Sequence, residues 1–468
     1  MMRYALPLVL LAATALSACS LQPKLELPAP PVPAALPTGG VYPAASAPAA
    51  AEIGYRDVIV DTRLRGLIDQ ALVNNRDLRV AAANIVAARA QYRIQRADLA
   101  PSVDLGAGAS YADRGSASTS SSANAGGGTR SYSVDIGMSA YEIDFFGRIR
   151  SLTDEALNRY LATESAARAT RLTLIADVAD AWSSYAADKT LLAVAEQTAA
   201  NAETSVGLTR ARLDGGVAPR TDLRQAETVL ASAQADVAQQ RTAVAQDLNA
   251  LQLLVGAAVD AAALPASIEE TDKAFAALSA GVDSSVLLHR PDIIQAEYEL
   301  RAANANIGAA RAAMFPRISL TATAGVASNA LSALFGSGTF SWSTGSSLSL
   351  PLFNAGALRA GVDVSKAQLD VAVATYERSI QSAFRETADA LARQGTLDDQ
   401  IAAQRRNLAA AEDTNTLTDA RYRGGVDTYL SSLVAQRSLY TAQRGMVGIE
   451  LTQAVNRVAL LRALGGGA

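Results

Sequence analysis

The stretch that decides the fold of this chain occurs twice, as Ala211-Arg212-Leu213-Asp214-Gly215-Gly216-Val217 and as Ala420-Arg421-Tyr422-Arg423-Gly424-Gly425-Val426. The two copies lie 209 residues apart, and the same offset matches further pairs, among them Gly147/Gly356, Ala179/Ala388, Ala226/Ala435 and Gly256/Gly465. Nearer the start of each copy the offset becomes 215 residues, as in Asp77/Asp292 and Pro101/Pro316. One loop of unequal length would produce this change. A period this long indicates a duplicated domain rather than a short-repeat solenoid.

Each copy contains two segments in which apolar and polar residues alternate. They cover residues of about 102–112 and 131–144 in the first copy, and of about 317–328 and 340–352 in the second. Four segments of about ten residues with a period of two are typical of transmembrane β-barrel strands. A soluble four-stranded sheet is the alternative that the pattern leaves open.

After its strands, each copy contains an unusually long helical segment, Arg150–Asp214 or Leu358–Arg423. The first has no proline over 65 residues, which at 1.5 Å per residue is roughly 98 Å of helix. Its apolar positions follow the seven-residue spacing of a coiled coil: Val178, Tyr185, Leu192, Ala199, Val206 and Leu213. The glycine pair then permits a tight reversal, and a second helix is expected to return over Thr221–Val255 or Tyr429–Leu464.

Four strands are too few to close a barrel. Within a membrane an open sheet edge would leave backbone amides unpaired in hydrocarbon, and single-chain barrels have at least eight strands. Two copies of the chain would supply eight strands and a filled interior, whereas three would supply twelve and a pore. The sequence therefore predicts a mainly α-helical protein with a transmembrane β-barrel, built by several chains and continued by a long helical tunnel.

The N-terminus has the features of a bacterial lipoprotein signal. One positive charge, at Arg3, precedes a twelve-residue apolar run, Ala5–Leu16, which is too short to span a bilayer. The run ends in Leu16-Ser17-Ala18-Cys19, and Cys19 is the single cysteine of the chain. Small residues before this cysteine match a lipobox, so we expect a covalent N-terminal lipid on Cys19. Ser20 rather than aspartate follows, which favours sorting to the outer membrane of a Gram-negative bacterium.

These features divide the chain into four parts: a signal peptide at 1–18, a tether at 19–60, a first repeat at 61–280 and a second repeat at 281–468. Eight of the 15 prolines lie between Pro23 and Pro48. This composition predicts an extended tether that holds the lipid away from the folded body, with simple disorder as the alternative.

The composition argues against an enzyme. About a fifth of the chain is alanine, aromatic residues make up 5%, and the single histidine is His289. Catalytic triads and metal sites built on several His or Cys ligands are therefore not expected, and neither is a cofactor other than the lipid. A net charge of −4 provides no basic surface for nucleic acid. Trp182, at the heptad spacing, is expected in the core.

In combination, several motifs resemble the outer membrane factors of the TolC superfamily, in the OprM/NodT lipoprotein branch. They are the lipobox at Cys19, Tyr141-Glu142-Ile143-Asp144-Phe145-Phe146-Gly147-Arg148, Arg290-Pro291-Asp292-Ile293, Phe315-Pro316-Arg317-Ile318-Ser319-Leu320 and Tyr422-Arg423-Gly424-Gly425-Val426-Asp427. The resemblance implies a homotrimer with a twelve-stranded barrel, a helical barrel and an equatorial belt. It also implies a passive exit duct for drugs or other small molecules. The implied partners are a periplasmic adaptor and an inner-membrane pump of the RND type.

The resemblance also implies roles for residues at the hairpin tips. The pairs Gly215-Gly216 and Gly424-Gly425 correspond to the adaptor-docking region, and a purely conformational role is the alternative. In this branch the periplasmic gate contains a leucine, an aspartate and an arginine. The resemblance implies that Leu430, Val434 and Arg437 occupy the corresponding positions here. Because valine replaces the aspartate, we expect an apolar constriction braced by Arg437, with Asp427 as a possible substitute carboxylate. Simple packing of the hairpin is the alternative.

Two other functions remain open from the sequence. One is a duct for type I protein secretion, although such ducts more often lack a lipobox. The other is a structural periplasmic lipoprotein in which the long helices form a spacer. A spacer, however, has no need of four amphipathic strands of matched length.

Overall fold

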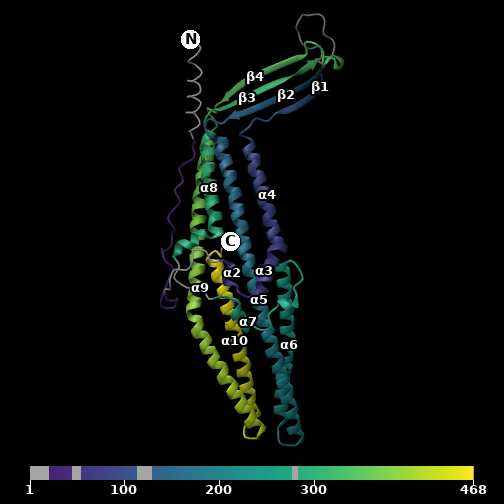
Figure 1. The fold of residues 1–468 in the computed structure, drawn as a ribbon, viewed down its shortest axis with the longest axis vertical. Helices are drawn as coiled ribbons and strands as arrows, with labels where there is room; N and C mark the ends of the chain where they lie inside the picture. Colours follow the sequence, from purple (N-terminus) through teal and green to yellow (C-terminus); the bar gives the residue numbers. More distant parts are fainter. Residues whose placement is uncertain (1–19, 45–53, 113–128, 277–282, 467–468) are drawn as a thin grey trace. The chain divides into compact units, whose positions relative to one another are not determined.

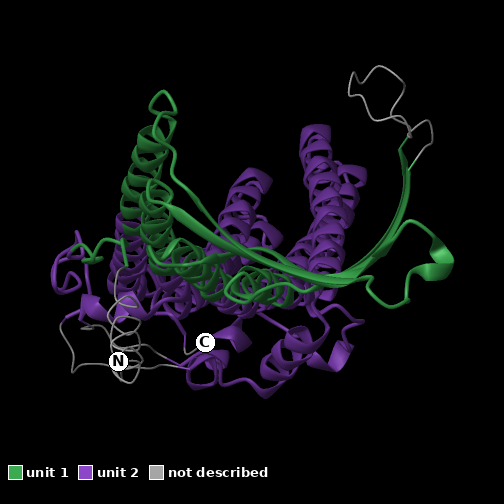
Figure 2. Cartoon of the chain, turned by 90° about the horizontal axis from the view of Figure 1, so that it is seen from above, with its two compact units in different colours: residues 1–28, 85–163, 296–376 green, residues 29–84, 164–295, 377–468 purple. Residues whose placement is uncertain are grey.

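A computed structural model describes residues 20–44, 54–112, 129–276 and 283–466. The helices of 13 residues or more are α3 (Thr62–Asn74), α4 (Arg76–Ala97), α5 (Arg148–Asp214), α6 (Arg220–Val255), α8 (Pro291–Ala312), α9 (Ala357–Arg423) and α10 (Tyr429–Ala463) (Figure 1). The shorter elements are α2 (Tyr55–Val58), α7 (Glu269–Ala274), η1 (Ala261–Ala263), η2 (Ser284–His289) and η3 (Leu331–Ala333). The chain forms two compact units, residues 1–28, 85–163 and 296–376, and residues 29–84, 164–295 and 377–468 (Figure 2).

The first unit contains the sheet. Its strands are β1 (Asp104–Ala112), β2 (Thr129–Ile143), β3 (Arg317–Ser328) and β4 (Phe340–Ser349), which pair antiparallel in that order. The prediction of four strands is confirmed, and β4 ends three residues earlier than expected. The described sheet has two open edges, because β1 and β4 each pair with a single neighbour.

The register separates the two faces of the sheet. One cross-strand row joins Leu105, Ile136, Ala324 and Trp342, and the adjacent row on the opposite face joins Gly106, Asp135, Gly325 and Ser341. One face is therefore apolar, whereas the other carries small and polar side chains. Hydroxyl pairs bridge strands on the polar face, as between Thr323 and Ser343 at 2.8 Å.

The two long helices follow the strands as predicted. Helices α5 and α9 each contain 67 residues, about 100 Å at the standard rise. On α5 the heptad positions Val178, Tyr185 and Val206 are buried, as expected for helices that pack along one stripe. Trp182 is also buried, and its indole N–H donates to the Ala263 carbonyl at 3.1 Å, which confirms its expected place in the core.

The duplication is visible in the contacts of the second unit. In the first copy, the Asn75 side-chain amide donates to the Leu254 carbonyl at 2.9 Å, near the end of α6. At the equivalent place in the second copy, the Arg290 guanidinium donates to the Ala463 carbonyl at 3.2 Å, at the end of α10. Different side chains therefore make the same connection, between the start of one helix and a carbonyl that has no helical partner at the end of another.

The N-terminal segment differs from the expected tether. The Pro23 carbonyl accepts from Asn304 at 3.0 Å in the first unit, and the Pro33 carbonyl accepts from Ser284 at 2.7 Å in the second. Leu36 is buried. Residues 20–44 are thus extended but packed on the chain's own helices, so the expectation of a segment free of the folded body is wrong for this range. Cys19 lies outside the described residues.

A buried carboxyl group on α5 makes stability depend on pH. The pKa of Asp180 is raised to about 7, mainly by burial and also by the nearby Asp177 carboxylate, whereas Arg462 acts in the opposite direction. The native state therefore keeps a proton that the unfolded chain loses near pH 4, so the free energy of unfolding should fall between about pH 4 and pH 7.

We expect Asp180→Asn to remove most of this dependence. The variant should be more stable than the wild type at pH 8, by roughly 2–4 kcal/mol, and similar to it near pH 4. Unfolding midpoints at both pH values provide the measurement. The control is Asp389→Asn, because Asp389 occupies the equivalent position in the second copy and is exposed. Equal pH profiles for wild type and Asp180→Asn would contradict the assignment.

Candidate functional site: the tips of the helical hairpins

Each helical hairpin of the second unit reverses through the same hydrogen-bond pattern. At the end of α5, Val217 N–H donates to the Arg212 carbonyl and Gly216 N–H to the Leu213 carbonyl, both at 2.9 Å. At the end of α9, Val426 N–H donates to the Arg421 carbonyl and Gly425 N–H to the Tyr422 carbonyl. This is the Schellman arrangement, in which a left-handed residue closes a helix.

The two glycines of each pair have different roles. Gly216 and Gly425 have φ angles of +70° and +74°, whereas Gly215 and Gly424 are not left-handed. A Cβ atom on Gly215 or Gly424 would meet only ordinary contacts, the nearest being a backbone oxygen at 3.4 Å. The conformational role therefore belongs to the second glycine of each pair.

Alanine substitutions should separate these roles. We expect Gly216→Ala or Gly425→Ala to cost about 1–2 kcal/mol, because alanine is strained in the left-handed conformation. Gly215→Ala and Gly424→Ala are the matched controls and should be neutral or slightly stabilising. Unfolding of the purified protein, compared across the four variants, provides the measurement. Equal losses within each pair would show that the turn geometry is wrong.

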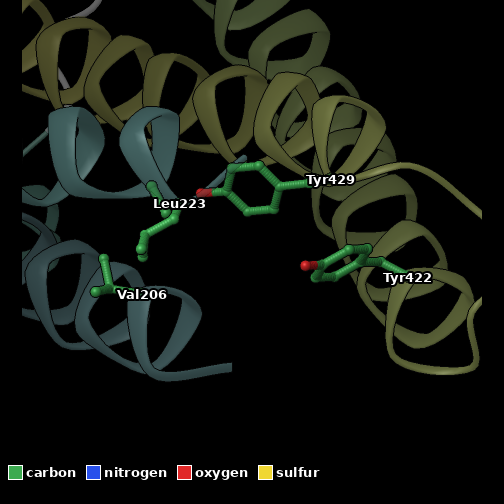
Figure 3. Close-up of a cluster of buried hydrophobic side chains, with 5 residues drawn as sticks. Val206, Leu223, Tyr422 and Tyr429 are labelled. Atoms are coloured by element: carbon green, nitrogen blue, oxygen red, sulfur yellow. The ribbon is translucent and has the colours of Figure 1, made fainter. Parts of the chain in front are cut away.

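Two tyrosines close to these turns join the two hairpins. Tyr422 of α9 and Tyr429 of α10 have ring centroids 5.5 Å apart, and both are buried. Figure 3 shows their rings directed towards Val206 of α5 and Leu223 of α6. The cluster therefore contains residues from all four helices and packs one hairpin against the other within the chain.

Polar contacts strengthen this junction. The Arg212 guanidinium donates to the Tyr422 carbonyl at 2.9 Å, and the same group lies over the Tyr422 ring at 4.9 Å. The Thr209 and Tyr422 hydroxyls are 3.5 Å apart. The Tyr429 hydroxyl is buried without a partner among the described residues, and its burial raises the pKa of this phenol to about 12. The tips are thus held together by a packed aromatic pair and one cation.

The residues that the resemblance assigns to the gate lie on α10 and in the turn before it. Leu430 and Val434 lie one turn apart on α10 and are 57% and 55% exposed. Asp427 instead pairs with Arg421, at 2.7 Å across the α9–α10 turn, and this hydrogen bond to Arg421 lowers the pKa of Asp427. Asp427 is therefore already neutralised by a cation of its own chain.

Arg437, the third residue assigned to the gate, lies on α10. Its side chain lines a groove of about 620 Å³ in the second unit, together with Arg224, Asp236 and Tyr440. Within the described part of the chain, the Arg437 guanidinium makes no hydrogen bond or ion pair, whereas the Tyr440 hydroxyl donates to Asp236 at 3.0 Å. The guanidinium is free to meet a group outside its own chain.

Sequence reasoning missed the tyrosine pair and Arg212. The signal was present, because Tyr422 and Tyr429 flank the second glycine pair in a chain with only 5% aromatic residues. Their contact with the first hairpin, however, joins residues about 210 positions apart.

No helix of the described chain is long and apolar enough to cross a membrane. None of the described residues form a group of three or more His, Cys, Asp or Glu side chains suited to a metal ion.

Comparison with known proteins decides the family. The model of the outer membrane efflux protein family matches residues 67–257 and 282–466, one match for each copy of the duplication. The chain belongs to the outer membrane efflux protein family. It is an outer-membrane efflux channel protein, and this membership decides against the purely structural periplasmic spacer.

Relatives and solved structures agree with this membership. The outer membrane protein ArpC of an antibiotic efflux pump from Pseudomonas putida is 46% identical over 464 residues, which cover 98% of this chain and 95% of ArpC. The outer membrane protein TtgC of a toluene efflux pump, also from Pseudomonas putida, has the same identity and coverage. The open-state structure of the MtrE outer membrane channel of Neisseria gonorrhoeae is 36% identical, with a TM-score of 0.84, over 96% of this chain and 98% of MtrE. The expected fold class is confirmed.

Proposed function

We propose that three copies of this outer membrane efflux protein form one closed duct through the outer membrane. The observation that carries the proposal is the four-stranded sheet with two open edges and one apolar face. Pairing β4 of one copy with β1 of the next would satisfy the edge amides, which hydrocarbon cannot do. Twelve strands enclose a pore, whereas eight leave an interior filled by side chains.

Electron microscopy of the detergent-purified mature protein tests this assembly. Averaged top views should show a threefold ring with a central hole, on a particle longer than about 100 Å. Native mass spectrometry of the same sample should give the mass of three chains. Monomers or solid rods that persist after gentle extraction from membranes would contradict the proposed duct.

We further propose that the duct is passive and releases drugs or other small molecules. In this proposal an inner-membrane pump of the RND type delivers them through a periplasmic adaptor, and a lipid on Cys19 adds an anchor. ArpC and TtgC are named for antibiotic and toluene efflux pumps, which supports a small-molecule cargo. Deleting each candidate pump in turn, and measuring cellular accumulation of a fluorescent substrate, tests the partnership. Metabolic labelling with a fatty-acid analogue tests whether Cys19 is lipidated.

The hairpin tips are proposed as the adaptor-docking region and the periplasmic gate. Three features support this: Gly215 and Gly424 have no conformational need to be glycine, Val217 and Val426 are exposed beside them, and Leu430 and Val434 are uncovered on α10. Around a threefold axis, three copies of Leu430 and Val434 would form an apolar constriction. Asp427 is assigned to locking the α9–α10 turn through Arg421 rather than to replacing a gate carboxylate.

A further inference from the structure

The groove that Arg437 lines in the second unit has the size and the mixed lining of a small-molecule site. We call it the hairpin groove, because α5, α6, α9 and α10 all contribute side chains to it. Its volume of about 620 Å³ lies within the range of sites that bind drug-sized molecules, roughly 300–1,000 Å³. Val229, Leu433 and Leu439 supply apolar surface, and amide and hydroxyl side chains such as Gln225 supply hydrogen-bonding groups.

The charged side chains of the hairpin groove leave one cation without a partner. Arg224 pairs with Glu227 at 2.5 Å on α6, and Asp236 accepts a hydrogen bond from the Tyr440 hydroxyl at 3.0 Å. The Arg437 guanidinium, by contrast, has no carboxylate within ion-pair distance among the residues that the structure describes. Its N–H donors are therefore available to a group that enters the groove.

The contact between Asp236 and Tyr440 keeps the carboxylate of the groove occupied. Burial, together with the hydrogen bond to Asp236, raises the pKa of the Tyr440 phenol. The phenol therefore stays protonated at neutral pH and continues to donate to Asp236. Since Arg224 and Asp236 both have partners within the chain, Arg437 decides the charge that the groove attracts, and this charge is negative.

Asn415 provides a second unpaired group in the lining. Its side-chain oxygen is buried, and no donor within the described chain reaches it. A buried acceptor that lacks a donor costs free energy, because it has lost its hydrogen bonds to water. A molecule with an N–H or O–H group would restore this hydrogen bond, so Asn415 favours a ligand that carries a donor as well as an anionic group.

We propose that the hairpin groove is a binding site for amphipathic organic anions of drug size. A carboxylate or sulfonate would form a two-point contact with the Arg437 guanidinium. A flat apolar body would lie against Val229, Leu433 and Leu439, and an N–H group would donate to Asn415. An inorganic anion would leave the apolar surface uncovered, and an organic cation would be repelled by Arg437. The site belongs to a single chain, so it goes beyond the proposed duct and does not depend on the number of copies in it.

Two fluorescent ligands with the same aromatic body test the proposal. Dansylglycine carries a carboxylate, a sulfonamide N–H and a naphthalene ring, whereas dansylamide keeps the ring and the N–H but has no carboxylate. Each is titrated against the full mature protein in lipid nanodiscs, with empty nanodiscs as the blank. We expect saturable binding of dansylglycine, and an affinity for dansylamide that is lower by about tenfold or more, because dansylamide lacks the contact with Arg437.

Three variants locate the bound ligand. Arg437→Met should weaken dansylglycine binding by about tenfold and leave dansylamide binding unchanged. Arg406→Met is the matched control, because Arg406 is an exposed arginine of α9 outside the groove, and it should bind both ligands as the wild type does. Ser232→Trp places a large side chain at an exposed position of the groove lining and should weaken the binding of both ligands.

Native mass spectrometry and conductance of the same samples separate failure of the site from failure of the duct. Equal affinity of wild type and Arg437→Met for dansylglycine, or of the wild type for the two ligands, would overturn the site. A conducting trimer that binds neither ligand would assign the groove to contact with another protein chain, which also overturns the site. Saturable binding that depends on Arg437 in a sample without trimers or conductance would support the site and contradict the duct.

Discussion

Replacing Arg290 by methionine is expected to lower the free energy of unfolding by about 3 kcal/mol. The guanidinium is 8% exposed and joins three elements of the second unit. It pairs with Asp292 at 2.8 Å on α8 and with Glu386 at 3.0 Å on α9, and it donates to the Ala463 carbonyl that ends α10. Methionine keeps the aliphatic stem but deprives two carboxylates and a helix-terminal carbonyl of the guanidinium that donates to them.

Urea unfolding of the detergent-solubilised protein, followed by circular dichroism, measures this effect. Arg301→Met is the matched control, because Arg301 forms an exposed ion pair with Glu297 within one helix, and its loss should cost less than about 0.5 kcal/mol. Glu386→Gln combined with Arg290→Met should cost less than the two single changes together, since each removes the other's partner. Equal stability of Arg290→Met and Arg301→Met would rule out the proposed role of Arg290.

Truncating both Leu430 and Val434 to alanine is expected to open the proposed gate. The two side chains are exposed and one helical turn apart, so six of them would meet around the axis of a trimer. An apolar constriction blocks ions by excluding water, and smaller side chains widen it until water enters. Conductance of the purified protein in planar bilayers should therefore rise several-fold over the wild type.

Val217→Ala is the control for this measurement, since Val217 is an exposed valine at the tip of the other hairpin. Its conductance should match the wild type. Val434→Asp provides a second comparison, because three carboxylates would repel one another and bind cations, so that the conductance becomes sensitive to divalent cations. An unchanged conductance in the double alanine variant would exclude this position as the constriction.

The predictions made from the sequence succeeded where periodicity and backbone preference decide the outcome. The strand at 317–328 has the predicted bounds, and the bounds of α5 differ from the prediction by two residues at its start. The alternation of apolar and polar residues, the absence of proline from a helix and the glycine that ends it are local properties of the sequence. They therefore act before any distant contact forms. Docking of residues 20–44 was missed for the opposite reason. A proline-rich composition predicts an extended chain but does not identify Ser284 or Asn304 as its partners.

The sequence by itself determined the duplication, the four alternating strands and the two long hairpins, because each depends on the order of residues within a short window. The tertiary structure alone decided which glycine of each pair is left-handed, since Gly215 and Gly216 are the same residue type. It also paired Asp427 with Arg421 and gathered Tyr422, Tyr429 and Arg212 into one junction. These outcomes depend on backbone conformation and on contacts that form only when helices from both copies pack together.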